Sequence, residues 1–272
     1  MFRGLPPALA LLFLPFAALA EEGFVQALLD GEPVCLIAAV QGASVTSLGE
    51  LEEAPGELGS RDWWVTNLDG TAGQNRSGAP VMAECGCIEQ PVVSLAPQLT
   101  IEGSAAASNL QLRLPSKLER LANDSAAYVK ATGAELAQRE LGGAPVRLTH
   151  VVRTDLEGDG VDEVLLAGSW NPLVAEADPA AGYYSFLLLR RLVGGVVVTS
   201  EVEAWWEPHP SQDPTDVPFG PAYIEPVALF DIDGDGTVEL VTAVWGLEYV
   251  AYTLYRLQED GFRQVAECGC GC

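Results

Sequence analysis

An acidic nine-residue segment that occurs twice is the strongest constraint on how this chain can fold. The copies are residues 155–163, DLEGDGVDE (loop 1), and residues 231–239, DIDGDGTVE (loop 2). Both carry carboxylates at positions 1, 3, 5 and 9 and glycine at positions 4 and 6. Each copy lies between stretches rich in β-branched and apolar residues, a composition typical of strands. The sequence therefore predicts two strand–loop–strand units.

The spacing of these carboxylates predicts a divalent cation in each loop. Hard cations such as Ca²⁺ take about six to eight oxygen ligands, which a tight turn supplies by pointing alternate side chains inward. Glycine permits such a turn, and position 7 would add a backbone carbonyl. The expected ligands are Asp155, Glu157, Asp159, Val161 and Glu163 in loop 1, and Asp231, Asp233, Asp235, Thr237 and Glu239 in loop 2. The alternative is a pair of acidic turns that bind no ion tightly.

The first twenty residues predict a secretory signal peptide. Arg3 supplies the positive charge, residues 5–16 are mainly apolar, and Ala18-Leu19-Ala20 fits a cleavage site. No later stretch reaches the roughly 18 apolar residues that a membrane-spanning helix needs. We therefore expect cleavage after Ala20 and a periplasmic or secreted protein without a membrane span.

The charge balance excludes one class of partner. The formal net charge is −24 at pH 7. Nucleic acids and anionic membranes bind basic surfaces, so neither is expected here, whereas divalent cations suit such a chain. The expected partner is a cell-surface protein or a glycan, and the sequence leaves the oligomeric state open.

The cysteines predict disulfides. Six are present, in two groups of three: Cys35, Cys85, Cys87, Cys268, Cys270 and Cys272. An even number in an exported chain favours disulfide bonds, and a bond between the groups would tie the C-terminal tail to the N-terminal region. The alternative is a thiolate site for copper or zinc, since soft metals favour clustered cysteines.

Composition divides the chain into a signal peptide (1–20), an N-terminal β and loop region (21–115), a helical segment (116–143) and a β domain with the two loops (144–272). Ser116-Lys117-Leu118-Glu119 fits a helix capping box, and Ala126 to Leu141 is helical in character, with a stop at Gly142-Gly143. Residues 41–80 are expected to be long loops around a strand at 62–66, residues 100–109 a flexible connection, and residues 110–114 a strand. The expected fold class is α+β, mostly antiparallel β.

The C-terminal part, about residues 145–266, resembles the bacterial FG-GAP/VCBS-repeat proteins. The resemblance lies in RTDLEGDGVDEVLLAG (153–168) and LFDIDGDGTVELVTA (229–243). It implies Ca²⁺ held in each loop, although Glu157 stands where the family usually has Asp or Asn. It also implies a β-meander with two such units after the helical middle, with a partial or degenerate β-propeller as the alternative.

Catalytic motifs are scarce. The chain has only two histidines, His150 and His209, and no H-E-x-x-H, G-x-S-x-G or S-x-x-K stretch. Two tryptophan pairs, Trp63-Trp64 and Trp205-Trp206, fit packing or a sugar-binding surface. The favoured function is a calcium-stabilised binding or structural module. The alternatives are an extracytoplasmic glycan hydrolase and a cysteine-based metal-handling or redox protein.

Overall fold

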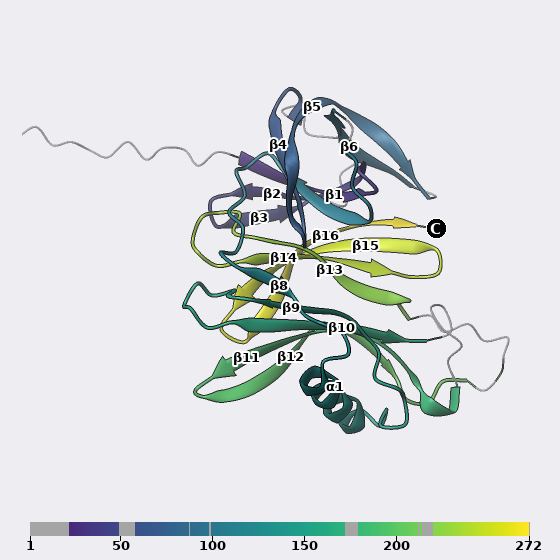
Figure 1. The fold of residues 1–272 in the computed structure, drawn as a ribbon. Coiled ribbons are helices and arrows are strands. Elements are labelled where there is room, and N and C mark those ends of the chain that lie inside the picture. The colour runs from purple at the N-terminus through teal and green to yellow at the C-terminus, as the bar shows by residue number, and fades with distance from the viewer. Residues whose placement is uncertain are drawn as a thin grey trace, which may run out of the picture.

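The computed structural model describes residues 22–48, 58–86, 88–97, 99–171, 179–211, 213 and 220–271. The expected signal peptide and its cleavage site lie outside these residues. The described chain forms three antiparallel sheets and one α-helix. The expectation of a mostly antiparallel β protein is therefore confirmed. The sheets lie in layers (Figure 1), and the described residues form no propeller.

The N-terminal sheet has the order β3-β2-β1-β7-β4-β5-β6. Its strands are β1 (Glu22–Leu29), β2 (Glu32–Gln41), β3 (Ser44–Ser47), β4 (Asp62–Asn67), β5 (Gly70–Cys85), β6 (Ile88–Ala96) and β7 (Ser104–Ser108). The sheet is curled into a half-barrel around a core that includes Leu28 and Trp63. The buried side chain of Gln26 on β1 holds the curl, because it bonds both the N–H (2.7 Å) and the C=O (2.9 Å) of Val93 on β6.

The other two sheets form the C-terminal part. The outer sheet has the order β12-β11-β10-β9-β8, and the middle sheet has the order β13-β14-β15-β16. The outer strands are β8 (Leu118–Arg120), β9 (Leu148–Thr154), β10 (Glu163–Trp170), β11 (Tyr183–Val193) and β12 (Val196–Glu207). The middle strands are β13 (Tyr223–Phe230), β14 (Glu239–Trp245), β15 (Tyr249–Gln258) and β16 (Gly261–Gly271). A short 3₁₀ turn, η2 (Pro179–Ala181), precedes β11.

Strands β13 to β15 of the middle sheet are buried on both faces. Leu254 and Val241 belong to the core shared with the N-terminal sheet, whereas their neighbours Tyr255 and Leu240 belong to the core shared with the outer sheet. Successive side chains of a strand point to opposite faces, so strands covered on both faces are almost continuously apolar. This explains why the sequences of β14 and β15 show little polar alternation.

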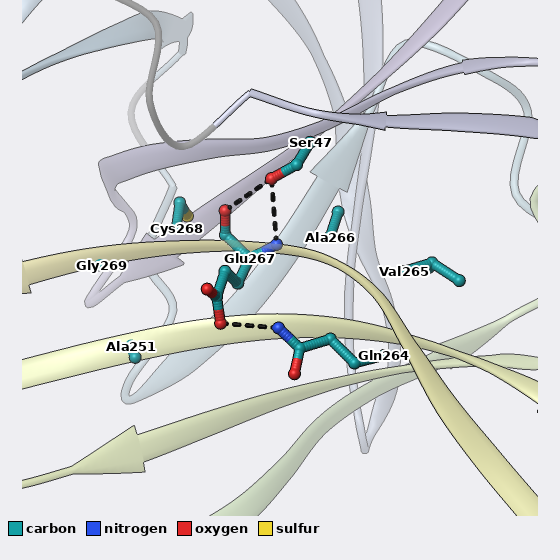
Figure 2. A pocket seen from close by; sticks show the side chains of 8 residues that line it. All are labelled: Ser47, Ala251, Gln264, Val265, Ala266, Glu267, Cys268 and Gly269. Atoms are coloured by element: carbon teal, nitrogen blue, oxygen red, sulfur yellow. Dashed lines mark hydrogen bonds between the residues drawn. The ribbon is translucent and has the colours of Figure 1, made fainter.

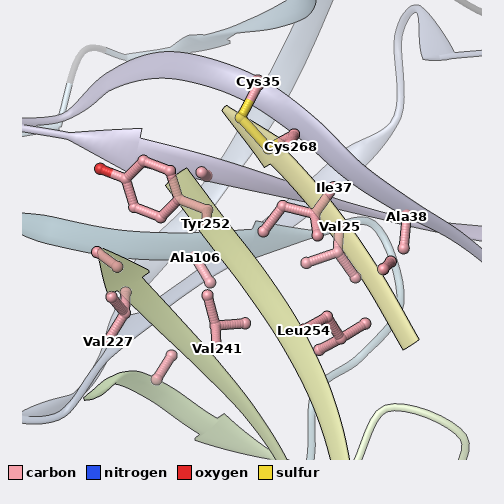
Figure 3. Close-up of a cluster of buried hydrophobic side chains, with 14 of the residues drawn as sticks. Val25, Cys35, Ile37, Ala38, Ala106, Val227, Val241, Tyr252, Leu254 and Cys268 are labelled. Carbon is pink, nitrogen blue, oxygen red and sulfur yellow. A yellow bond between two sulfur atoms is a disulfide. The ribbon is translucent and has the colours of Figure 1, made fainter. Parts of the chain in front are cut away.

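A disulfide joins the first and last parts of the chain. Cys35 on β2 is bonded to Cys268 on β16, across 233 residues. Figure 3 shows the bond at the edge of the core between the two sheets, close to Tyr252 and Ile37. Cys270 is also disulfide-bonded, and an isolated bridge pairs Gly86 with Gly271. The expected bond between the two cysteine groups is confirmed, and it is typical of an extracytoplasmic protein.

The helical expectations are confirmed in one place and wrong in another. The helix α1 (Ala126–Gln138) covers the outer face of the outer sheet. It stops before the expected glycines, since Glu140 takes the left-handed conformation (φ 62°) and Leu141 N–H returns to Leu136 C=O. The capping box at Ser116 is wrong, because residues 118–120 form β8 and pair with β9.

Three expectations for the N-terminal half and its connection are also wrong. Residues 70–85, expected to be loop up to residue 80, form the long strand β5. Residues 104–108, expected to be flexible, form β7 in the middle of the sheet, where the small side chains of Ala105 to Ala107 are fully buried. Residues 110–114 form no strand, although Arg113 makes a single bridge to Asp231. The strand at 62–66 is confirmed as β4.

Removing the disulfide should destabilise the protein strongly, because the bond closes a very long loop and restricts the unfolded chain. We expect Cys35→Ser with Cys268→Ser to lower the free energy of unfolding by about 2–5 kcal/mol. Urea unfolding measures this value. An unchanged midpoint would show that the two sheets hold together without the bond.

Candidate metal centre

The two acidic loops occupy equivalent places in two meanders. Loop 1 connects β9 to β10 and loop 2 connects β13 to β14, and each is followed by a third antiparallel strand, β11 or β15. The glycines at positions 4 and 6 have positive φ in both copies, from 69° to 92°. The prediction that these glycines permit a tight turn is confirmed, since other residues rarely adopt a positive φ.

The first carboxylate of each loop organises its turn. Asp231 accepts the N–H of Gly234 at 2.6 Å and that of Gly236 at 3.1 Å. Asp155 accepts the N–H of Asp159 at 3.1 Å and that of Gly160 at 2.9 Å. The backbone therefore wraps around this side chain in both copies.

The apolar residue at position 2 anchors each loop from the other side. Leu156 is fully buried and Ile232 nearly so. The apolar anchor of each loop therefore lies in the protein interior, whereas Glu157, Asp159 and Asp235 are exposed.

Loop 2 gathers three carboxylates. One oxygen from each of Asp231, Asp233 and Asp235 lies within 4.8 Å of the others. A set of converging carboxylate oxygens fits a hard divalent cation. Among the described residues this is the one such cluster of three acidic, histidine or cysteine side chains. Loop 1 does not bring its carboxylates together to this degree.

The glutamates at position 9 accept hydrogen bonds from the backbone of their own loops. Glu163 accepts the N–H of Leu156 at 2.8 Å, and Glu239 accepts the N–H of Ile232 at 3.0 Å. Both are buried. Burial raises the pKa of both carboxyls, that of Glu239 to about 7. Each glutamate therefore joins position 9 to position 2 of its loop. The carbonyls of Val161 and Thr237 remain predicted ligands.

An arginine on the third strand of each unit holds the carboxylate at position 3. Arg256 on β15 donates to Asp233 and to Glu239, both at 3.0 Å. Arg191 on β11 donates to Glu157 at 3.2 Å and to the carbonyls of Gln258 and Glu259. The longer side chain of Glu157 thus points to an arginine. Sequence reasoning missed both arginines, because only the strand register places them beside the loops.

The two loops touch each other. Val238 of loop 2 donates its N–H to the carbonyl of Leu156 in loop 1 at 3.2 Å. A side chain at Gly158 would lie 3.3 Å from the carbonyl oxygen of Gly236, so glycine allows this close approach. The sequence showed two loops, and the packing of the middle sheet on the outer sheet makes them neighbours.

The connection before β8 runs along both loops. Arg113 exchanges backbone hydrogen bonds with Asp231 (3.2 and 2.7 Å) and donates from its side chain to the carbonyl of Gly234 at 3.2 Å. Lys117 lies 3.7 Å from Asp162 of loop 1. These cations offset part of the negative charge of the loops.

A separate groove of about 750 Å³ lies along β16 and next to β3. Figure 2 shows Ser47 between the backbone N–H and C=O of Glu267, to which it bonds at 3.3 and 3.1 Å. Glu267 also accepts a hydrogen bond from Gln264 at 2.6 Å. Glu267 is the only carboxylate among the described lining residues, so the groove wall does not supply the carboxylate pair that most glycan hydrolases use.

Two of the paired tryptophans and three of the cysteines have structural partners. Trp63 is fully buried in the half-barrel. Trp206 stacks on Phe186 at 5.4 Å and lies under the guanidinium of Arg139 at 4.5 Å. Cys35, Cys268 and Cys270 are disulfide-bonded and offer no thiolate to a metal. Packing therefore accounts for Trp63 and Trp206, and disulfides for these three cysteines.

No protein-family model, curated protein or solved structure matches this chain. Within the described residues, no helix is both long and apolar enough to cross a membrane.

Replacing Arg256 with methionine should leave the buried carboxylate of Glu239 without its cation. We expect the free energy of unfolding in EDTA to fall by about 3 kcal/mol, since breaking a buried ion pair strands the remaining charge. Arg263→Met is the matched control, because its ion pair with Asp260 (3.1 Å) is exposed and contributes little. Urea unfolding of both variants measures the difference, and equal losses would contradict this role of Arg256.

His150 should give the stability a distinct pH dependence. It lines a cavity of about 300 Å³ beside β8, and burial together with the charge of Arg120 lowers its pKa to about 4. The unfolded histidine takes up its proton near pH 6.5. This contribution is therefore complete above pH 6.5 and is lost as the pH falls toward 4, by up to about 3 kcal/mol.

Urea unfolding from pH 7 to pH 4 tests this prediction. His150→Gln should lose less stability than the unmodified protein over that window, because glutamine does not titrate. The carboxylates titrate in both proteins, so their effect cancels in the comparison. The same substitution at the exposed His209 controls for loss of an imidazole. Parallel profiles for the unmodified protein and His150→Gln would contradict the prediction.

Proposed function

We propose that this protein is an exported, Ca²⁺-stabilised binding or structural module. The observation that carries the proposal is the convergence of Asp231, Asp233 and Asp235 within 4.8 Å. Three carboxylates this close repel one another, and a divalent cation would turn that repulsion into attraction. An ion that binds only the folded state adds its binding free energy to stability.

The role proposed for the ion is structural. Loop 2 is tied to β15 through Arg256 and to the connection before β8 through Arg113. An ion in this loop would therefore stabilise the place where the middle sheet, the outer sheet and the connection meet. The resemblance of residues 153–168 and 229–243 to FG-GAP/VCBS repeats supports the same ion.

A second ion is proposed for loop 1, with Asp155, Asp159 and the carbonyl of Val161 as its first ligands. Glu157 would have to exchange Arg191 for the ion, so this site should be the weaker one. The proposed partner of the whole module is a cell-surface protein or a glycan.

Thermal unfolding with Ca²⁺ and with EDTA tests the proposal. We expect the melting temperature to be higher in Ca²⁺, and Asp235→Asn to abolish most of that difference. The substitution keeps the oxygen that accepts the Thr237 N–H at 2.7 Å and removes only the charge. A loss of the Ca²⁺ effect can therefore be assigned to the ion and not to the turn.

Asp159→Asn is the matched control. Asp159 has the same position in loop 1 and accepts the N–H of Val161 at 2.8 Å. It should reduce the Ca²⁺ effect less than Asp235→Asn does. Equal melting temperatures in Ca²⁺ and EDTA for the unmodified protein would overturn the proposal, and isothermal titration with Ca²⁺ checks the result without unfolding.

A further inference from the structure

The hairpin between β11 and β12 has an apolar tip on an otherwise acidic protein. Gly194 and Gly195, both with positive φ, make the turn. Around them Leu192, Val193, Val196, Val197 and Val198 are 41–65% exposed. Exposed apolar side chains that lie next to one another mark interaction surfaces more often than isolated ones do.

The tip lies at a free sheet edge. β12 is the last strand of the outer sheet, paired only with β11 among the described strands. An edge strand offers a row of unused backbone N–H and C=O groups to another strand. Natural edges are usually protected by charged residues, proline or bulges. The second half of β12 has such protection, because it carries three glutamates and a bulge next to Glu201. Residues 196–200 carry no charge and precede that bulge.

Charge favours this edge as the place where two copies can approach. With a net charge of −24, most of the surface of one copy repels that of another. Residues 179–200 contain no carboxylate, and their only charged side chains are Arg190 and Arg191. Two copies that meet at this hairpin avoid facing carboxylates at the point of contact.

We propose that the protein self-associates through this hairpin, with residues 196–200 of β12 in two copies pairing antiparallel about a two-fold axis. Antiparallel addition of identical edge strands is self-complementary, as a two-fold interface requires. The apolar tips expose only a few hundred Å² each, whereas a stable interface buries roughly 800 Å² per partner. The backbone edge and the neighbouring Thr199 and Ser200 therefore belong to the interface.

The mass of the purified protein in solution tests the proposal. We expect light scattering at micromolar concentrations to give the mass of two chains, and Val196→Lys with Val197→Lys to reduce it to one. Both side chains are more than half exposed, so the far-UV circular dichroism of the folded chain should not change. Added salt should favour the pair, because it screens the repulsion between acidic copies.

Leu247→Lys is the matched control, since Leu247 is as exposed as Val196, at 65%, and lies outside the hairpin. It should leave the mass at two chains. A single-chain mass for the unmodified protein at every concentration and salt level would overturn the proposal. A two-chain mass that survives the lysine substitutions would also overturn it. So would a single-chain mass together with binding to neutral phosphatidylcholine vesicles that the lysine substitutions abolish, since the tip would then contact lipid and not a second copy.

Discussion

Burial of the middle sheet on both faces is the constraint on which the rest of the structure depends. Strands β13 to β15 are almost entirely buried, so the N-terminal sheet and the outer sheet must both pack on them. The outer sheet directly precedes the middle sheet in sequence, whereas the N-terminal sheet is distant, since β1 and β16 lie at opposite ends of the described chain. The Cys35–Cys268 bond joins the two layers across this distance.

The same packing creates the candidate metal centre. Loops 1 and 2 come from different sheets and meet only because the middle sheet lies against the outer one. Leu156 and Val238, which link the loops through one hydrogen bond, are also buried in the core between these sheets. Apolar packing therefore positions the acidic loops, and the charges of Arg256, Arg191 and Arg113 offset the repulsion that results.

Sequence reasoning was most accurate where pattern and local chemistry agree. The glycines of both loops and the strand at 62–66 are confirmed, as is a helix that begins at Ala126, although it ends at Gln138 and not at the expected Leu141. It failed for β5 and β7, whose glycine, serine and alanine residues have low strand propensity. β7 is a strand because its backbone pairs with both β1 and β4, and the side chains of Ala105 to Ala107 are fully buried there. Such an effect depends on neighbours distant in sequence.

The sequence by itself determined that the chain carries two acidic turns between strands, cysteines suited to an oxidising compartment, and an acidic surface. These are local properties of residue type and spacing. Only the tertiary structure decided that Asp231, Asp233 and Asp235 converge while Glu163 and Glu239 bond to the backbone. It also decided which arginine faces each loop and that the loops are neighbours, because strand register and sheet packing are set by long-range burial.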